Sequence, residues 1–272
     1  MEYFTTAGGI TVHLQDSGPK ENTAIVLLHG YLETMYIWSE FAEKLSEKYR
    51  VITLDMPGHG LTDSAPESLS PTGESINTME FDASVIKALV EKIGLNKVCV
   101  GGHSMGGYVA QMCCKMYSET FEKLIIFNSN PYKDPEEKSA DRKREIDVIN
   151  GGKLNVLAAA SIPKMYNCDN LRKYDDKVME TVELCETHNP AGIIASIKGM
   201  MVRPDMQDLW ENPPVPIMLI CGDMDNFLPL STIEVLKEKF KKVKFALLPG
   251  TGHNSFIENS DEVLKEVINF IG

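Results

Sequence analysis

The sequence predicts an α/β protein, with a doubly wound, mostly parallel sheet and a helical cap inserted between two of its strands. Three observations lead to this prediction. Short runs rich in Val, Ile and Leu recur along the chain, segments with a helical apolar stripe separate most of them, and the stretch from 131 to 204 breaks the alternation. Alternating strands and helices are typical of a parallel sheet that helices cover on both faces.

The expected strands begin with a hairpin, in which EYFTT and ITVHLQD flank Gly8 and Gly9. Glycine readily adopts the positive φ that a tight turn requires. Six short apolar runs then have the character of buried parallel strands: 24–30, 49–55, 97–104, 123–129, 215–223 and 243–250. Five further segments have the apolar spacing of amphipathic helices: 38–49, 78–94, 108–121, 232–242 and 261–271.

Strand signals disappear between Pro131 and Pro204, where breakers such as Gly151-Gly152 separate helical segments. We therefore expect a helical cap at 131–204 and a core formed by 1–130 and 205–272. The cap is rich in Met, Ile and Leu, and methionine adapts to irregular apolar surfaces. Its apolar side chains either pack on the core or help to line a substrate pocket, for which the candidates in the cap and nearby loops are Leu32, Met165, Ile193, Ile197, Met200 and Phe227.

Composition argues against several classes of partner. The formal net charge of −12 would repel nucleic-acid phosphates and anionic lipids, and no basic cluster offsets it, so neither nucleic acid nor a membrane is expected. We find no secretion signal, and the six cysteines lie mostly in apolar helix or strand patterns. These features favour a cytoplasmic protein with reduced thiols. The oligomeric state stays open, because no heptad seam decides it.

The strongest local motif is G-H-S-M-G, from Gly102 to Gly106, between an expected strand and an expected helix. The pentapeptide alone has little specificity because Gly and Ser are common, but the strand–turn–helix context raises it. Such a turn holds Ser104 in a strained conformation with its hydroxyl exposed, and it directs the Met105 N–H toward a developing oxyanion. A glycine-rich turn without chemistry is the alternative. Phosphate binding is disfavoured because no phosphate-loop pattern is present.

A serine hydroxyl needs a base to take its proton and a further group to orient that base. The segments ICGDMDNFLP and LLPGTGHNSFIEN follow successive expected strands, which brings an acid and a histidine to one sheet edge. His253 is the candidate base, and Asp223 and Asp225 compete for the role of the acid. The order Ser, Asp, His along the chain is the order expected when the nucleophile lies on a strand-to-helix turn. Five other histidines are expected to be structural: His13, His29, His59, His103 and His188.

Five motifs together resemble the α/β-hydrolase superfamily and follow one another in its order along nearly the whole chain. They are H-G-Y at 29–31, D-M-P-G-H-G at 55–60, G-H-S-M-G-G at 102–107, G-D-M-D-N-F-L-P at 222–229 and G-T-G-H ending at His253. The segment 196–225 further resembles capped members such as 3-oxoadipate enol-lactonases and related carboxylesterases. Haloalkane dehalogenases and epoxide hydrolases would carry Asp where this chain has Ser104.

The resemblance implies roles for particular residues. The pattern G-x-x-D-x-x-x-P, from Gly222 to Pro229, selects Asp225 as the acid and leaves Asp223 to a structural turn. The loop after strand 24–30 would give the second oxyanion donor, which we assign to the Tyr31 N–H, with the Leu32 N–H as second choice. Acyl transfer then needs neither a cofactor nor a metal.

Three functions are compatible with these observations. The first is hydrolysis of a small to medium ester or lactone through an acyl-enzyme on Ser104. The second is a carbon–carbon bond hydrolase, or a lyase resembling the menaquinone-pathway synthase, on the same triad. Cationic groups reaching the pocket would favour it, and the candidates are Lys153, Lys164 and Arg203. The third is a ligand-binding signalling protein with negligible turnover. In each case the expected partner is a small molecule.

Overall fold

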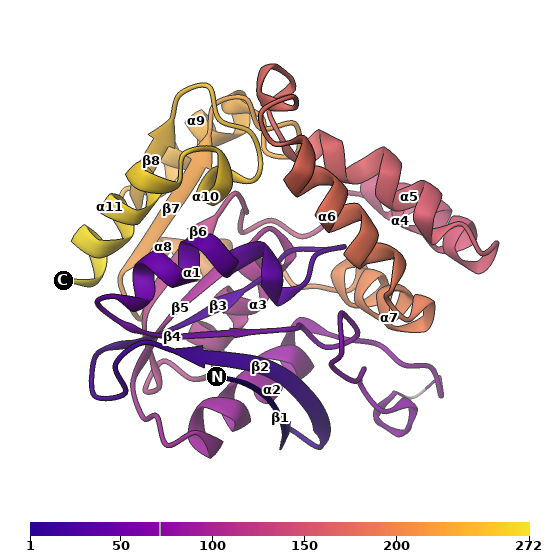
Figure 1. The fold of residues 1–272 in the computed structure, drawn as a ribbon, viewed down its shortest axis with the longest axis horizontal. Helices are drawn as coiled ribbons and strands as arrows, with labels where there is room; N and C mark the ends of the chain where they lie inside the picture. The colour runs from indigo at the N-terminus through magenta and orange to yellow at the C-terminus, as the bar shows by residue number, and fades with distance from the viewer. Residues whose placement is uncertain (71) are drawn as a thin grey trace.

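The computed structural model of the protein describes residues 1–70 and 72–272. An eight-stranded sheet crosses the molecule in the order β1-β2-β4-β3-β5-β6-β7-β8 (Figure 1). The pair β1 and β2 and the pair β2 and β4 are antiparallel, and the other neighbours are parallel. The strands are Glu2–Ala7 (β1), Ile10–Ser17 (β2), Ala24–Leu28 (β3), Arg50–Leu54 (β4), Val98–His103 (β5), Phe121–Phe127 (β6), Ile217–Gly222 (β7) and Lys244–Leu248 (β8). The predicted α/β class and mostly parallel sheet are confirmed.

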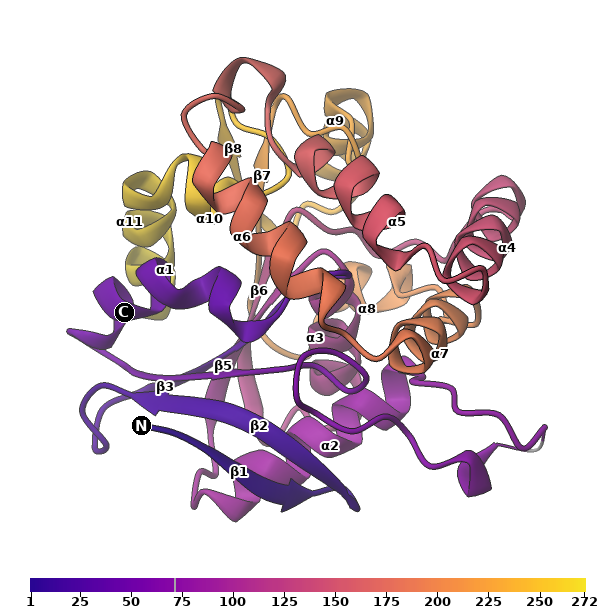
Figure 2. The ribbon, with the colours of Figure 1, turned by 45° about the vertical axis from the view of Figure 1, so that its right-hand side comes forward.

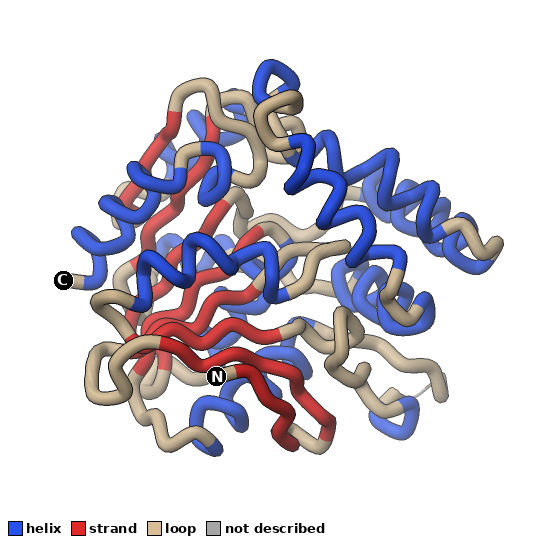
Figure 3. The backbone as a smooth tube through the Cα atoms, viewed as in Figure 1, coloured by secondary structure: helices blue, strands red, loops and turns tan. Residues whose placement is uncertain are grey.

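Helices occupy the connections between the parallel strands (Figure 3). The α-helices are Ser39–Ser46 (α1), Met79–Lys92 (α2), Met105–Met116 (α3), Glu136–Asn150 (α4), Leu154–Ser161 (α5), Asp175–Glu186 (α6), Pro190–Met201 (α7), Gln207–Glu211 (α8), Leu230–Lys239 (α9), Ser255–Glu258 (α10) and Ser260–Ile271 (α11). Within the described residues, no helix is both long enough and apolar enough to cross a bilayer.

The sheet separates two apolar layers. Along β3, Val26 and Leu28 belong to the core layer that contains α2 and α3, whereas Ile25 and Leu27 belong to the layer that contains α1 and α11. Successive side chains of a strand point to opposite faces, so a strand that is apolar at every position fits only where helices cover both faces. This is why the continuous apolar runs of the sequence form the central strands.

Helix α3 begins at Met105, three residues earlier than the sequence pattern predicted. Gly106 and Gly107 weaken a helix intrinsically and look like part of a turn in the sequence. In the structure they are helical because neighbouring atoms leave no room for a side chain: a Cβ at Gly106 would overlap the Leu28 carbonyl oxygen, and one at Gly107 would lie 2.6 Å from Ser129 Cβ. Close packing therefore outweighs helix propensity directly after Ser104.

Between β6 and β7, the described chain forms helices and turns and contains no strand. We refer to residues 131–204 as the cap segment. In it, α4 packs against α7 and α5 packs against α6, and the four helices lie together to one side of the sheet (Figure 2). The carboxyl ends of the parallel strands face these helices, which is the edge where open α/β sheets bind ligands.

Candidate active site

A cavity of about 450 Å³ lies between the sheet edge and the cap segment. Ser104 follows β5 and His253 follows β8, and both line the cavity. The cap segment contributes Arg142, Met165 and Met200 to the opposite wall. A volume of this size accommodates a small organic molecule.

Ser104 has a backbone conformation that is rare for a residue with a side chain. Its φ is 50° and its ψ is −111°. The turn is held in place by two hydrogen bonds, from the Ser104 N–H to the Phe127 carbonyl at 3.0 Å and from Ser129 Oγ to the Ser104 carbonyl at 2.8 Å. A Cβ at Gly102 would overlap the Gly106 carbonyl oxygen, so this turn requires glycine there. Strain of this kind is typical of functional positions.

His253 is joined to Asp225 by a buried hydrogen bond of 2.8 Å between Nδ1 and Oδ2. The second oxygen of Asp225, Oδ1, accepts the N–H groups of Phe227 at 2.7 Å and Leu228 at 3.0 Å. Burial alone would raise the pKa of Asp225, but His253 and these donors hold it below its ordinary value. The carboxylate is therefore charged at neutral pH and fixes the orientation of the His253 ring.

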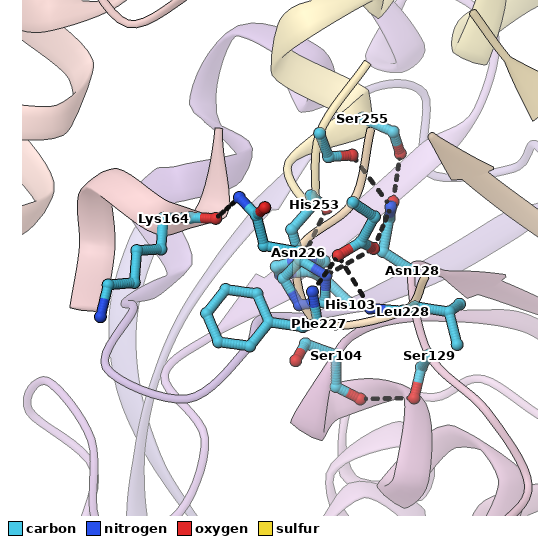
Figure 4. Close-up of polar contacts among 12 residues, drawn as sticks. His103, Ser104, Asn128, Ser129, Lys164, Asn226, Phe227, Leu228, His253 and Ser255 are labelled. Carbon is cyan, nitrogen blue, oxygen red and sulfur yellow. Dashed lines mark hydrogen bonds and ion pairs between the residues drawn. The ribbon is translucent and has the colours of Figure 1, made fainter. Parts of the chain in front are cut away.

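Asn128 is a member of this site that the sequence analysis did not identify. Its Nδ2 donates to Asp225 Oδ2 at 2.9 Å and to the Gly252 carbonyl at 3.1 Å, and its Oδ1 accepts Ser255 Oγ at 2.5 Å (Figure 4). It follows β6 with a φ of 50°, which asparagine tolerates better than most residues. The sequence signal for Asn128 was a polar residue directly after an expected strand. In the sheet, that strand lies between the two strands that lead to Ser104 and Asp225.

Asp223 has a different role from Asp225. Its Oδ1 accepts the Gly250 N–H at 2.7 Å and the Thr251 N–H at 3.4 Å, so it braces the start of the loop that carries His253. The structure therefore puts Asp225 in contact with the histidine and gives Asp223 a turn.

No hydrogen bond joins Ser104 to His253 in the described structure, although both side chains face one cavity (Figure 4). Hydrogen bonds between a nucleophile and its base are often long without substrate and shorten in the reacting complex. Two backbone donors are available close by. Met105 is the first residue of α3, and neither its N–H nor that of Tyr31 has a partner within the described chain. Leu32, next to Tyr31, is fully buried with a φ of 66°.

The apolar pocket candidates divide into two groups. Met165, Met200 and Phe227 line the cavity. Leu32, Ile193 and Ile197 do not line it; their side chains are fully buried in the apolar layer that α2 and α3 share with the cap segment. Their helical and loop positions direct them to the core rather than to the cavity, so packing is the better interpretation for these three.

The cavity wall is more charged than the Met-rich sequence suggested. Lys133, Lys138, Arg142 and Arg203 line it, against the acidic residues Asp134 and Glu145. The Arg203 guanidinium contacts Asp134 at 2.7 Å and the carbonyls of Tyr132 and Met200. Arg142 is also buried; within the described residues its carboxylate contacts are two long ones, of 3.4 Å each, to Asp134 and Glu145, and its guanidinium lies over the Tyr31 ring. Lys153 and Lys164, named from the sequence, are not part of this wall.

No cluster of three or more His, Cys, Asp or Glu side chains that could hold a metal ion occurs in the described residues. All six cysteines are unpaired, and five of them are buried. Burial raises the pKa of the Cys99, Cys185 and Cys221 thiols to about 12, so these three are protonated at neutral pH.

The chain is similar to known proteins over its full length. A family model described as "alpha/beta hydrolase fold" matches residues 23–144. A Bacillus subtilis protein named putative 2-succinyl-6-hydroxy-2,4-cyclohexadiene-1-carboxylate synthase is 27% identical, over 98% of this chain and 97% of its own length. A thermophilic esterase from Thermogutta terrifontis, solved with malate bound, superimposes with a TM-score of 0.89 at 24% identity, covering 100% of this chain and 98% of the esterase.

An enol-lactonase from Burkholderia xenovorans LB400 has a similar structure, with a TM-score of 0.87 at 18% identity over 99% of both chains. These structural likenesses concern the fold. The matched family model covers the loop after β3 and the turn at Ser104, and the similarity to the Bacillus subtilis protein extends through the loops of Asp225 and His253. The chain therefore has the α/β-hydrolase fold.

Proposed function

We propose that the protein is a serine hydrolase that cleaves a small to medium carboxylic ester or lactone through an acyl-enzyme on Ser104. The observation that supports this most directly is the buried Asp225–His253 hydrogen bond of 2.8 Å beside the strained Ser104 turn. A protein that only bound a ligand would gain nothing from a charged carboxylate buried against a histidine. The proposal goes beyond the fold to a particular reaction.

In this reaction His253 accepts the Ser104 proton as the hydroxyl oxygen attacks the carbonyl carbon, and it then returns the proton to the leaving alkoxide. Water attacks the acyl-enzyme in the same way and releases the acid. Asp225 keeps the Nδ1–H tautomer of His253, so that Nε2 is free to accept the proton. The N–H groups of Met105 and Tyr31 are the proposed donors to the oxyanion.

We propose that the cap segment selects the substrate. Met165, Met200 and Phe227 offer apolar contact to an acyl or alcohol group, and Arg142 adds a polar end to the cavity. The free thiols support a reducing compartment such as the cytoplasm.

The second candidate function is a reaction of a carboxylated substrate on the same triad, either carbon–carbon bond hydrolysis or a lyase step. One observation favours it: Arg142 is buried at the cavity wall, and its guanidinium has only two distant carboxylate contacts. The N–H groups of Arg142 that the protein leaves unused are available to a carboxylate of the substrate. The Bacillus subtilis relative is named a putative 2-succinyl-6-hydroxy-2,4-cyclohexadiene-1-carboxylate synthase.

The decisive experiment treats the purified protein and a Ser104→Ala variant with a fluorophosphonate probe, followed by assays with p-nitrophenyl esters of increasing acyl length. We expect labelling and ester turnover in the wild type and their loss in the variant. Loss of the nucleophile lowers turnover by several orders of magnitude in enzymes of this kind. The acyl length with the highest kcat/KM would report the size of the cavity.

Ser46→Ala is the control, because Ser46 lies on α1 away from the cavity and its hydroxyl donates only to the Glu43 carbonyl. It should label as the wild type does. A folded wild-type protein that neither labels nor turns over esters would refute the hydrolase proposal and favour a ligand-binding protein. Labelling by the probe with turnover of carboxylated diketones alone, and no ester hydrolysis, would favour the second candidate.

A further inference from the structure

Glu33 and His103 form a buried pair beside the site. Both side chains are completely shielded from solvent, and His103 Nδ1 lies 2.9 Å from Glu33 Oε2. Glu33 belongs to the loop after β3, which also carries Tyr31, and His103 is the last residue of β5, directly before Ser104. The pair therefore joins the proposed oxyanion loop to the nucleophile turn.

The pair also reaches the loop of the proposed base. His103 Nε2 lies 3.1 Å from the backbone carbonyl oxygen of His253, and the centroids of the two rings are 4.8 Å apart (Figure 4). On the other side, Glu33 Oε2 accepts the Gly30 N–H at 2.6 Å. One carboxylate and one imidazole thus connect all three loops on which acyl transfer would depend.

The geometry defines where the protons lie. A carbonyl oxygen can only accept, so Nε2 of His103 carries a proton, and the contact between Nδ1 and Glu33 Oε2 requires a second one. Burial alone would raise the pKa of Glu33, but the charge and hydrogen bond of His103 hold it below its ordinary value. Glu33 is therefore a carboxylate, whose Oε2 accepts the Gly30 N–H and faces His103 Nδ1.

We propose that the Glu33–His103 ion pair positions the base and the oxyanion loop relative to Ser104. His103 Nε2 holds the His253 carbonyl, and the Glu33 carboxylate holds the Gly30 N–H. Both are positioning residues, and the inference rests on the proposed acyl transfer at Ser104. Trp38 and Phe256 pack their rings against His103.

Stability alone does not account for this pair. A buried ion pair usually stabilises a fold no more than an apolar replacement would, because both charges lose their hydration. Glu33 Oε1 in addition has no partner within the described chain. The loop is built closely around the pair, since a Cβ at Gly30 would lie 2.8 Å from both Glu33 Oε2 and His103 Nδ1. The Glu33–His103 pair is costly to bury and is tightly enclosed where the three site loops meet. These features indicate that it positions the loops.

Protonation can be observed directly in protein labelled with ¹⁵N-histidine, because long-range ¹H–¹⁵N spectra distinguish protonated from unprotonated ring nitrogens. At neutral pH we expect both nitrogens of His103 to be protonated, with the signal assigned through its loss in His103→Gln. In Glu33→Gln, we expect one nitrogen to lose its proton, because a neutral amide cannot balance a buried imidazolium. His253 is the internal comparison, with an expected proton on Nδ1 only.

Kinetics separate positioning from folding. Glu33→Gln and His103→Gln each leave a buried partner without its counterion, so each should lower the melting temperature. The double variant removes both charges and should recover much of that loss. Its kcat should nevertheless stay about tenfold to a hundredfold below the wild type with KM nearly unchanged, since displacement of a loop by about 1 Å has effects of that size. The exposed pair Lys87 and Glu91 provides the control, because neutralising it should change neither value.

Two results would overturn the inference: an unprotonated nitrogen on wild-type His103, or a double variant with the kcat of the wild type. A purely structural pair would give the second result once stability had recovered. Failure of the proposed function has a different signature, because the wild type itself would then show no labelling at Ser104. The NMR spectra would still decide the protonation of His103 in that case.

Discussion

Asp223 and Asp225 lie two positions apart after β7, yet they bind different partners. Asp225 contacts His253 Nδ1, whereas Asp223 accepts the backbone N–H groups of Gly250 and Thr251. Their chemical identity makes them a matched pair for testing the proposed triad at the scale of single residues.

We expect Asp225→Asn to lower kcat by about three to four orders of magnitude, since a neutral amide no longer fixes the tautomer of the base, as in a chymotrypsin-type triad with the same change. Asp223→Asn should lower thermal stability modestly and leave kcat within about a few-fold of the wild type, because only a turn is weakened. Steady-state kinetics on a p-nitrophenyl ester, with melting temperatures, test both. Equal kcat values for the two variants would refute the assignment.

The sequence allowed the residues of the proposed triad to be named because each of them lies in a recognisable motif that follows a strand. Asn128 could not be named, because a single polar residue after a strand has no distinctive pattern. Its role depends on β6 lying between β5 and β7, and that order of strands is a property of the folded sheet. Glu33 could not be identified for the same reason, because its partner His103 lies 70 positions away in the sequence and only the fold brings them together.

At the scale of elements, Glu258 at the end of α10 holds the cap segment to the loop of His253. Its Oε1 accepts the Gly252 N–H at 2.8 Å, and its Oε2 accepts the Asn167 N–H at 3.1 Å and Asn170 Nδ2 at 2.7 Å. Three donors converge on the two carboxylate oxygens. Burial raises the pKa of Glu258 although these donors oppose that effect.

Glu258→Gln should loosen this junction, because the amide nitrogen of glutamine faces donors and cannot accept from them. We expect the Asn167 and Gly252 amides to exchange with deuterium about tenfold faster or more, while the amides of the central strands keep their protection. Hydrogen exchange measured by NMR tests this. Glu262→Gln on the surface of α11 is the control, and unchanged exchange in Glu258→Gln would show that the carboxylate does not anchor the cap segment.

Most elements were predictable because their apolar periodicity reflects burial on one face or both. The positions that line the cavity were less predictable. Helix α4 is highly charged in sequence, and nothing local shows that Arg142 turns inward while its neighbours face solvent. Ile193 and Ile197 looked equally suitable for a pocket wall, but α7 directs them into the core. Which face of a cap helix meets the cavity is decided by tertiary packing.

At the scale of the whole molecule, two buried histidines make stability depend on pH. Burial lowers the pKa of His29 and lowers that of His59 further. The unfolded chain takes up protons at both positions as the pH falls below about 6.5, whereas the folded protein resists them. Their contribution to stability is therefore constant above that pH and declines below it, toward the folded pKa values.

We expect the free energy of unfolding to fall between pH 6.5 and pH 5, by at most about 1.4 kcal/mol per pH unit for each of the two histidines. Urea titrations at several pH values measure this slope. His59→Gln should reduce it, because one of the two titrating groups is gone. A slope that is equally steep in the variant would show that other groups cause the acid sensitivity.

The strained backbone at Ser104 bears on how this protein could evolve. Glycine adopts a φ of 50° without the cost that any side chain incurs, so Ser104→Gly should melt at a higher temperature than the wild type while losing the nucleophile. A laboratory selection for heat resistance alone would thus drift toward an inert protein. The serine can persist in a lineage only while its chemistry is under selection.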